Sequence, residues 1–436
     1  MSDSLNYPIV GVAGMSHLGL VSAATFAAKG FTTVCYDTNT ALIHDLQQRK
    51  WPVEEPELDS LLKNHAQRMA FTAAIGNLKN CDVIYIALDV VTNDTNESDL
   101  TFIQALIDEV ADIMDDGTLV VVLSQVAPGF MRQLPIPHQQ LFYQVETLIF
   151  GQAVHRALHP ERYIIGCAEV HVPLPKALET LLKAFHCPIL PMRYESAELA
   201  KMAINLFLAS SVTTTNILAE VAAKVGANWN EIVPTLKLDK RIGPHAYLQP
   251  GLGIAGGNIE RDLASIIKLG DRFGTNTEVV QAWCENSEYQ KNWIYRCLQD
   301  NIFARQQNPR MTLLGLAYKA NTHSVKNAPS LQLLPKLKGH VVTVHDPIVN
   351  GRHLADFVNV APNLLDALDQ ADVVIILTPW ADYARLSAKT LKEKMHGRWI
   401  IDPFQVLNQS EFEKEGFHIF TLGRGSSVSH KVEEYA

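Results

Sequence analysis

The stretch YPIVGVAGMSHLGL at residues 7–20 decides the fold of the N-terminal half. It opens with an apolar run typical of a buried strand, turns between Gly14 and Gly19, and continues into the helical pattern HLGLVSAATFAAKG. A second apolar run, TTVCYD, ends in Asp37. A glycine-containing turn between a strand and a helix, with an acid at the end of the next strand, predicts a dinucleotide-binding βαβ unit.

The residue types of this turn favour NAD. Gly14 and Gly19 allow the tight turn and close helix packing, and the helix N-terminus receives a pyrophosphate. Asp37 would bond the ribose hydroxyls and repel a 2′-phosphate, which favours NAD over NADP. Ser16 stands where glycine normally lets the backbone approach the phosphates. The alternative interpretation is a plain tight turn without a ligand.

Apolar patterning predicts two α/β domains with a helical region between them. CDVIYIAL at 81–88 and TLVVVLS at 118–124 are continuous apolar runs, as in parallel strands buried on both faces, and they belong to a predicted NAD-binding domain over residues 1–195. Residues 196–300 are mostly helical, beginning with one long helix that ends near Gly226. Short apolar strands return near Asn308, which predicts a second domain over 301–436. The fold class is α/β, with two doubly wound Rossmann-like domains joined by a long central helix.

Composition narrows the function. A net charge of −9 without any basic run argues against nucleic acid as a partner. The N-terminus has no basic region before its apolar stretch, and we expect no apolar run to approach the ~18 residues of a membrane helix. Six cysteines lack CxxC pairing, and the histidines lack a metal-binding spacing. We therefore expect a cytoplasmic protein with no metal and no membrane or nucleic-acid partner.

Two further segments carry chemistry. PGLGIAGGNIERD at 250–262 has small residues that let a backbone pass close to a ligand, followed by a polar cluster.

On the long helix, Lys201 and Asn205 are one turn apart and share a face. A lysine on a largely apolar helix has its ammonium disfavoured by desolvation, which suits it to proton transfer. A solvated surface lysine is the alternative, and the spacing leaves both interpretations open.

These pieces resemble the UDP-glucose/GDP-mannose dehydrogenase family over nearly the full length of the chain. The resemblance implies an NAD domain, a central helix that forms a homodimer, and a C-terminal domain for the nucleotide of a sugar. Its substrate would be a nucleotide sugar, with a UDP-sugar favoured, whose C6 alcohol becomes a carboxylate with two NAD. The matching segments are GMSHLGL with Asp37, EPEL at 55–58, SQVAPG at 124–129, HPE at 159–161, Lys201 with Asn205, RIG at 241–243, residues 250–262, and LAYKANT…APS from 316 to 330.

The residues implied for the first oxidation are all present. In the family, a lysine and an asparagine, with an aspartate after the glycine loop, organise proton transfer from the alcohol and stabilise the oxyanion. The corresponding residues here are Lys201, Asn205 and Asp262.

The residues implied for the second oxidation are mostly missing. That step uses a cysteine thiolate, which forms a thiohemiacetal and then a thioester that water hydrolyses with help from a glutamate and a threonine. Asn258 stands in place of the cysteine and Gln125 in place of the threonine. Glu161 remains, whereas the second glutamate of that strip corresponds to Ile165. We therefore expect a single hydride transfer. Cys167 and Cys284 are candidates for a relocated nucleophile, although free cysteines are more commonly buried, inert residues.

The resemblance also implies the ligand contacts, with further departures. Lys326 stands where an NAD-contacting arginine is expected, Phe404 replaces part of a Gly-Arg pair, and the turn near the adenine ribose reads Asp89-Val90-Val91. The remaining implied cofactor residues are Ser124, Gln125 and Arg261. The implied substrate residues are Arg241 (which reaches the substrate of the second subunit in the family), Tyr247, Gly251, Gly253, Tyr318 and Lys319.

Three functions remain open from the residues. The first is an NAD-dependent oxidoreductase that makes a carbonyl product from a nucleotide sugar. The second is an epimerase that oxidises its substrate transiently and returns the hydride. The third is a catalytically inactive binding or regulatory homologue. The retained trio of Lys201, Asn205 and Asp262 favours the first, and the departures at the thioester and ligand positions favour the third.

Overall fold

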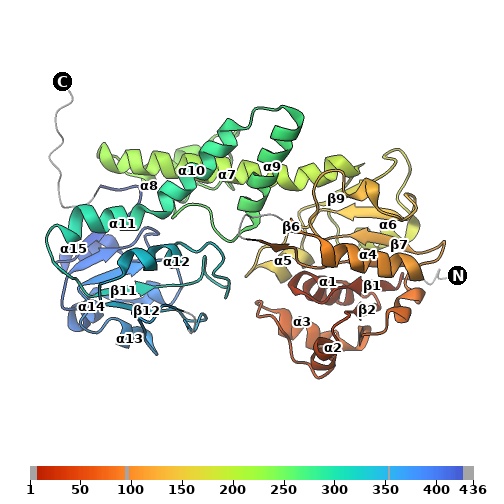
Figure 1. The fold of residues 1–436 in the computed structure, drawn as a ribbon, viewed down its shortest axis with the longest axis horizontal. Coiled ribbons are helices and arrows are strands. Elements are labelled where there is room, and N and C mark those ends of the chain that lie inside the picture. Colours follow the sequence, from red (N-terminus) through yellow and green to blue (C-terminus); the bar gives the residue numbers. More distant parts are fainter. Residues whose placement is uncertain (1–6, 94–97, 352–353, 426–436) are drawn as a thin grey trace. The chain divides into compact units, whose positions relative to one another are not determined.

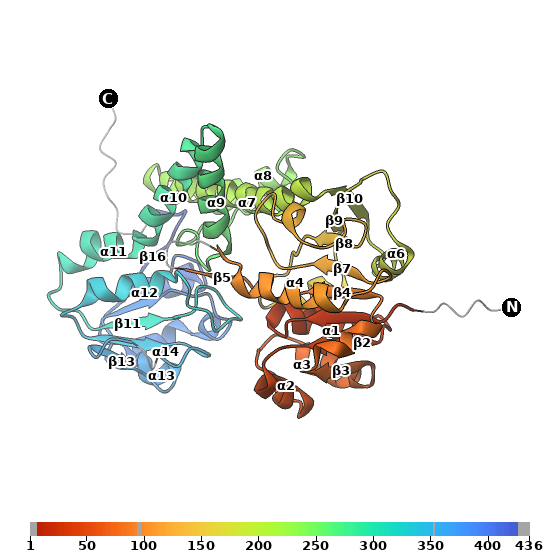
Figure 2. The same ribbon diagram turned by 45° about the vertical axis from the view of Figure 1, so that its right-hand side comes forward.

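The computed structural model describes residues 7–93, 98–351 and 354–425 (Figure 1). The chain forms two compact units, Met1–Ile204 and Asn205–Ala436. Each unit is built on one open sheet, and Figure 2 shows the same elements turned by 45°.

The first unit holds an eight-stranded sheet in the order β10-β9-β8-β7-β4-β1-β2-β3. All neighbouring strands are parallel except β8 and β9, which pair antiparallel. The strands in sheet order are β10 (Ile189–Arg193), β9 (Tyr163–Cys167), β8 (Leu141–Gln144), β7 (Leu119–Val122), β4 (Val83–Ile86), β1 (Val10–Ala13), β2 (Thr33–Tyr36) and β3 (Met69–Thr72). The helices are α1 (His17–Ala28), α2 (Thr40–Gln47), α3 (Leu58–Asn64), α4 (Thr101–Ile113), α5 (Ala153–Leu158) and α6 (Lys176–Lys183). A small hairpin pairs β5 (Val91–Thr92) with β6 (Ser98–Asp99).

The continuous apolar runs arise because helices cover both faces of this sheet. Along β4, Val83 and Tyr85 join the hydrophobic cluster that contains α1 and α6. Ile84 and Ile86 join the opposite cluster, which contains α4. Successive side chains of a strand point to opposite faces, so both sets must be apolar.

The long central helix is confirmed as α7 (Tyr194–Lys224), which is continuous over 31 residues. Gly226, at a φ of 77°, lies just beyond its end, as expected for a helix stop. By length and composition α7 could cross a membrane, so the expectation that no apolar stretch approaches that length was wrong. Its alanine, leucine, isoleucine and valine residues raise the mean hydropathy, although core helices of soluble proteins meet the same criterion.

The second unit contains the remaining helices of the 196–300 region and a six-stranded parallel sheet. Its sheet order is β13-β12-β11-β14-β15-β16. The helices before the sheet are α8 (Trp229–Leu238), α9 (Asn258–Phe273), α10 (Glu278–Lys291) and α11 (Trp293–Leu298). The strands in sheet order are β13 (Val358–Val360), β12 (Val342–His345), β11 (Met311–Leu314), β14 (Val373–Ile376), β15 (Trp399–Ile401) and β16 (His418–Phe420). Helices α12 (Pro329–Leu333), α13 (Leu364–Ala367), α14 (Ala388–Lys394) and α15 (Gln409–Lys414) pack on its two faces.

The two sheets share a turn that the residues alone did not reveal. Asp37 follows β2, and its Oδ2 accepts the backbone N–H of Met15 at 2.8 Å. In the second unit Asp346 follows β12, and its Oδ2 accepts the N–H of Leu316 at 2.7 Å. In both units the donor directly follows a glycine with positive φ at the end of the first strand. Each acid therefore fixes the turn that opens toward the carboxyl edge of its sheet.

Candidate active site

The fingerprint turn has the backbone geometry that the glycines predict. Gly14 has a φ of 96°, in the left-handed region that favours glycine. A Cβ at Gly19 would lie 1.7 Å from the main-chain oxygen of Gly14, so α1 packs against the turn only because residue 19 has no side chain. Asp37 holds the turn from the carboxyl end of β2, with its Oδ1 accepting the N–H of Asn39 at 2.9 Å. This part of the turn fits a dinucleotide.

Ser16 departs from the fingerprint, and its side chain is engaged within the unit. Its Oγ donates to the carbonyl oxygen of Ala87 at 3.2 Å and accepts the N–H of Asp89 at 3.0 Å. Ser124, at the carboxyl end of β7, accepts the N–H of Leu88 at 3.0 Å and donates to its carbonyl at 2.7 Å. Gln125 follows directly in the same loop. The predicted cofactor residues of this unit therefore meet at the segment after β4.

The central contact of the first unit joins α7 to the segment after β8. Lys201 donates from Nζ to the main-chain oxygen of Glu146 at 2.7 Å, and its Nζ lies 3.6 Å from the Glu146 carboxylate. The two side chains are only 12% and 19% exposed. Burial raises the pKa of the Glu146 carboxyl, and the positive charge of Lys201 partly opposes this rise. A buried lysine–carboxylate pair of this kind is suited to proton transfer.

Glu161, the carboxylate predicted to act in catalysis, lies elsewhere. Its side chain is 62% exposed and forms ion pairs with Arg156 at 3.4 Å and with Arg162 at 2.8 Å. Lys201 contacts Glu146 and not Glu161 in the described structure. The sequence offered one usable signal for Glu146: it stands just after the apolar run LFYQV, where the carboxyl end of a strand places functional side chains.

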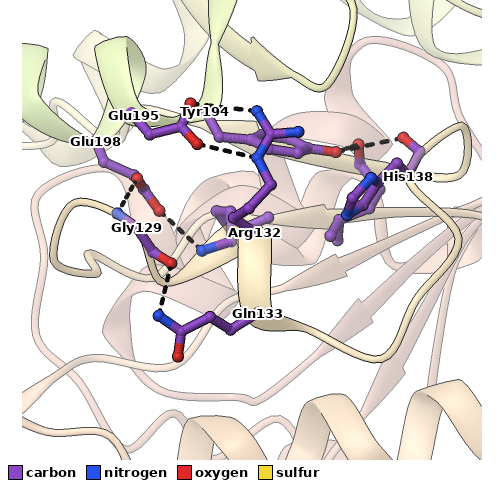
Figure 3. A network of polar contacts seen from close by, with 9 residues as sticks. Gly129, Arg132, Gln133, His138, Tyr194, Glu195 and Glu198 are labelled. Carbon is purple, nitrogen blue, oxygen red and sulfur yellow. Dashed lines mark hydrogen bonds and ion pairs between the residues drawn. The ribbon is translucent and has the colours of Figure 1, made fainter.

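The loop that carries Ser124 and Gln125 is tied to the start of α7 (Figure 3). The buried carboxylate of Glu198 accepts the N–H of Gly129 at 2.6 Å and that of Met131 at 2.8 Å. Arg132 forms a two-pronged ion pair with Glu195, at 2.9 and 3.2 Å. Because Glu198 lies three residues before Lys201, the helix that presents the lysine also anchors this loop.

In the second unit, the glycine loop packs closely on its neighbours. Gly253 and Gly256 have φ values of 79° and 96°. A Cβ at Gly256 would meet the ring of Tyr318 at 2.5 Å, and one at Gly253 would meet the main-chain oxygen of Ser287 at 2.6 Å. A Cβ at Gly251 would lie 3.6 Å from the ring of Phe404. The loop therefore runs against the segments that carry the predicted substrate residues.

The start of α9 is held by an ionic cluster around Glu260. Its carboxylate accepts the N–H of Gly257 at 3.0 Å, the Asn327 side-chain amide at 2.6 Å and the Lys291 ammonium at 2.9 Å. Asn258, the first residue of α9, is exposed. The Lys326 side chain lies beside Gly257, because a Cβ there would be 3.3 Å from it. Asn258 and Lys326 are thus brought to the same end of the helix.

Asp262 and Asn205, predicted to act together, are in contact. The Asn205 side-chain amide donates to Asp262 Oδ2 at 2.5 Å, and both side chains are buried. The Arg261 guanidinium lies 3.5 Å from the other Asp262 oxygen. This pairing fixes the orientation of the Asn205 amide one turn beyond Lys201 on α7.

The other predicted substrate residues are Arg241, Tyr247 and Lys319, and the first two are exposed. Arg241 is paired with Asp239 at 2.6 Å and its side chain is 89% exposed. Tyr247 is exposed, and its carbonyl oxygen accepts the Thr215 hydroxyl at 2.9 Å. The Lys319 ammonium lies 5.6 Å from the centre of the Tyr318 ring.

The cysteines weighed as relocated nucleophiles have settings unsuited to thiolate chemistry. Cys167 is buried on β9, and its Sγ lies 3.4 Å from the main-chain oxygen of Met192. Burial raises the pKa of both Cys167 and Cys284, which disfavours the thiolate form. Within the described ranges, no three His, Cys, Asp or Glu side chains gather as they would around a metal ion.

Family models cover most of the chain. The NAD binding domain of the UDP-glucose/GDP-mannose dehydrogenase family matches residues 9–186, its central domain matches 195–288, and its UDP binding domain matches 312–409. The first match identifies NAD as the cofactor of the N-terminal domain.

Whole-length relatives agree with these matches. The chain is 28% identical over 432 residues to the UDP-glucose 6-dehydrogenase TuaD of Bacillus subtilis, covering 95% of this chain and 93% of the relative. It is 27% identical to the UDP-glucose 6-dehydrogenase of Pseudomonas aeruginosa, covering 95% and 97%. Among solved structures, a UDP-glucose dehydrogenase from Pyrobaculum islandicum superposes with a TM-score of 0.83 at 26% identity, covering 95% and 97%.

Proposed function

The chain belongs to the UDP-glucose/GDP-mannose dehydrogenase family, and on that premise we propose that it removes a single hydride from a nucleotide sugar. The reaction converts a CH–OH group to a carbonyl group. NAD, held at the turn that contains Gly14, Gly19 and Asp37, would supply the acceptor for this hydride. The hydroxyl proton is taken up by the protein.

The observation that carries this proposal is the contact between Lys201 and Glu146. The Lys201 ammonium donates to the main-chain oxygen of Glu146 at 2.7 Å, and this hydrogen bond fixes its position. The Glu146 carboxylate lies farther away, at 3.6 Å, so the ammonium does not form a tight ion pair with it. An ammonium held in this way donates a hydrogen bond to the substrate oxygen and stabilises the charge that develops there. The Glu146 carboxylate then accepts the proton that the hydroxyl loses. We assign this proton-accepting role to Glu146, whereas the role that the resemblance implies for Glu161 belongs to the hydrolysis of a thioester.

Asn205 and Asp262 complete the polar set that the first oxidation requires. Their 2.5 Å hydrogen bond is buried, so the amide is held in one orientation. Because α7 is continuous, Asn205 follows Lys201 by one helical turn. The amide is therefore held in one orientation, one helical turn after the lysine.

The reaction stops at one hydride because no thiol stands at residue 258. An amide does not add to an aldehyde to form a thiohemiacetal, and the exposed Asn258 lies where the family places its cysteine. The buried Cys167 does not compensate, since burial raises its pKa. The aldehyde hydrate is itself an alcohol, so any second oxidation must proceed without a covalent adduct.

The C-terminal domain supports a UDP-sugar as the substrate. It matches the family's UDP binding domain, and the loop after β11 carries Tyr318 and Lys319 against the glycine loop. Lys319 supplies a cation for the diphosphate. Exposed apolar residues on α7, among them Phe207 (78% exposed) and Val221 (48%), support a homodimer formed through this helix. We place the protein in the cytoplasm on the basis of its scattered free cysteines.

The direct test is to incubate the purified protein with NAD and UDP-glucose, or another UDP-sugar, in the presence of hydrazine. The proposal expects NADH formation together with a trapped aldehyde that carries the intact nucleotide. Formation of a stable uronic acid without trappable aldehyde contradicts it. Conversion to an epimer without NADH supports the epimerase alternative, and the absence of turnover with NAD bound supports the inactive homologue.

A further inference from the structure

The N-terminus of α1 carries an internal carboxylate. The Asp89 Oδ2 accepts the N–H of Leu18, in the first turn of α1, at 3.4 Å. The backbone of Asp89 is held in place by Ser16, whose Oγ accepts the Asp89 N–H at 3.0 Å. The Asp89 side chain is exposed, so solvent reaches it and a ligand can displace it.

This position is the one at which a dinucleotide needs an anion site. First-turn N–H groups and the helix dipole attract negative charge, and in βαβ folds they receive the pyrophosphate. In this chain a carboxylate already accepts one of those N–H groups. Asp89 therefore satisfies the helix end and adds a negative charge where two phosphates would have to lie.

The negative charge of Asp89 also acts on the carboxyl group of Glu146. Burial raises the pKa of Glu146, Lys201 opposes the rise, and the negative charge of Asp89 adds to it. Asp89 therefore lies close enough to Glu146 for their charges to interact. An incoming pyrophosphate meets the Asp89 carboxylate unless Asp89 moves away or is neutralised.

Ser16 and Asp89 both depart from the family pattern, and the two residues are linked by a hydrogen bond. A glycine at residue 16 would have no Oγ to accept the Asp89 N–H. The backbone at Asp89 would then lose this hydrogen bond. The same Oγ also donates to the Ala87 carbonyl oxygen at 3.2 Å, which fixes the direction of the side chain. Ser16 thus positions the segment that presents the carboxylate.

We propose that Ser16 and Asp89 form an internal cap on α1 that competes with the pyrophosphate of NAD. Binding then requires displacement of the Asp89 carboxylate from Leu18. The cap lowers the affinity for NAD and makes it dependent on the charge of residue 89. This inference rests on the NAD-binding role of the first unit, which is part of the proposed function.

The test is the dissociation constant of NAD, measured by calorimetry or by quenching of intrinsic fluorescence, with no sugar present. Asp89→Asn keeps the size of the side chain and an oxygen acceptor for Leu18 but removes the charge. It should tighten NAD binding on the order of tenfold at low salt, as expected for removing one like charge near a phosphate. Because exposed charges are screened, the gain should shrink as salt is added. Ser16→Gly should change affinity in the same direction.

Asp116→Asn is the matched control. Asp116 is an exposed acid just before β7, at the amino ends of the strands, whereas the turn after β1 lies at their carboxyl ends. The same change in net charge at Asp116 should therefore leave NAD affinity unaltered. Equal affinity of the wild type and Asp89→Asn, with NAD bound by both, overturns the internal cap and leaves the proposed function standing. Failure of both proteins to bind NAD overturns both. Tighter binding by Asp89→Asn without oxidation of any nucleotide sugar supports the cap and contradicts the proposed function.

Discussion

The Lys201 ammonium lies 2.7 Å from the main-chain oxygen of Glu146 and 3.6 Å from its carboxylate, although 55 residues separate the two in the chain. This contact joins the central helix to the carboxyl edge of the first sheet. It brings a proton-donating and a proton-accepting group together in a half-buried setting. The proposed hydride transfer depends on this pair.

Replacing Lys201 with alanine should reduce kcat for NADH formation by at least about a hundredfold, the size expected for loss of a positioned acid–base group. Binding of NAD should remain, because the fingerprint turn is not altered. Lys224→Ala is the control, since its side chain lies near the end of the same helix and is 72% exposed. Steady-state kinetics of both variants checks the prediction, and unchanged turnover in Lys201→Ala removes the residue from the mechanism.

Glu146 should set the acid limb of the pH profile. As a proton acceptor it must be ionised, and burial raises its pKa above the ordinary 4.5. The value of kcat/KM should therefore rise with pH through a pKa above that figure. Glu146→Gln should lose this limb along with most of the activity, whereas Glu161→Gln, altered at an exposed site, should retain both. A limb that persists in Glu146→Gln contradicts the assignment.

The fold could be predicted because its signals are local. The strand at Val10, the turn at Gly14 and the acid at Asp37 lie within one short βαβ unit, and their order alone specifies a parallel pair around a helix. The resemblance to a family, and not spacing, predicts a shared role for Asn205 and Asp262, and the structure shows their side chains in contact.

The contacts that were missed depend on long-range geometry. The apolar run before Glu146 indicates only that this residue follows a strand, and it does not identify Lys201 as the partner of Glu146. Asp89 was noted only as a departure from a turn rich in Pro and Thr, because its contact with Leu18 spans 71 residues. Loop paths of this kind are set by packing and hydrogen bonding, which apolar periodicity does not encode.

Introducing a thiol at residue 258 should create a reactive site. Asn258→Cys places sulfur in the first turn of α9, where the helix N-terminus lowers a thiol pKa. The variant should be alkylated by iodoacetamide faster than any native cysteine. Burial raises the pKa of all six native cysteines, Cys35, Cys81, Cys167, Cys187, Cys284 and Cys297.

Mass spectrometry of partially alkylated protein measures the rate at each site. Wild-type activity should survive mild alkylation, and Asn258→Cys activity should not. Rapid inactivation of the wild type, with label on Cys167, would instead support a relocated nucleophile.

Ionised Glu55 should stabilise the first unit at pH values above the ordinary pKa of a glutamate. Burial raises the pKa of this carboxyl, but hydrogen bonds from His17 and from the N–H groups of Gly151 and Ala153 outweigh that effect and lower it below 4.5. A depressed pKa stabilises the fold above the unfolded value, and this contribution is lost as pH falls through the folded value. Glu55→Gln should cost about 1–3 kcal/mol at pH 7.

That deficit should shrink as the pH falls below 4.5, which denaturant titration at several pH values can measure. Glu57→Gln, two residues away and exposed, is the control and should show little change at any pH. A deficit that is constant with pH contradicts the linkage.

The Glu198 anchor should be needed for turnover. Glu198→Ala removes the acceptor for the N–H groups of Gly129 and Met131, so the loop with Gln125 loses its tie to α7. We expect kcat to fall by on the order of tenfold or more, as small misplacements of positioned groups do. Glu195→Ala, which breaks an exposed ion pair with Arg132, should have a smaller effect. Equal kinetics in the two variants would show that the loop is held by other contacts.

The number of NADH molecules formed per molecule of nucleotide sugar consumed tests the central claim most directly. With a trapping agent for aldehydes present and sugar limiting, the single-hydride account predicts a ratio of one. A ratio of two, with a uronic acid as the product and a thioester captured on the protein, would contradict it.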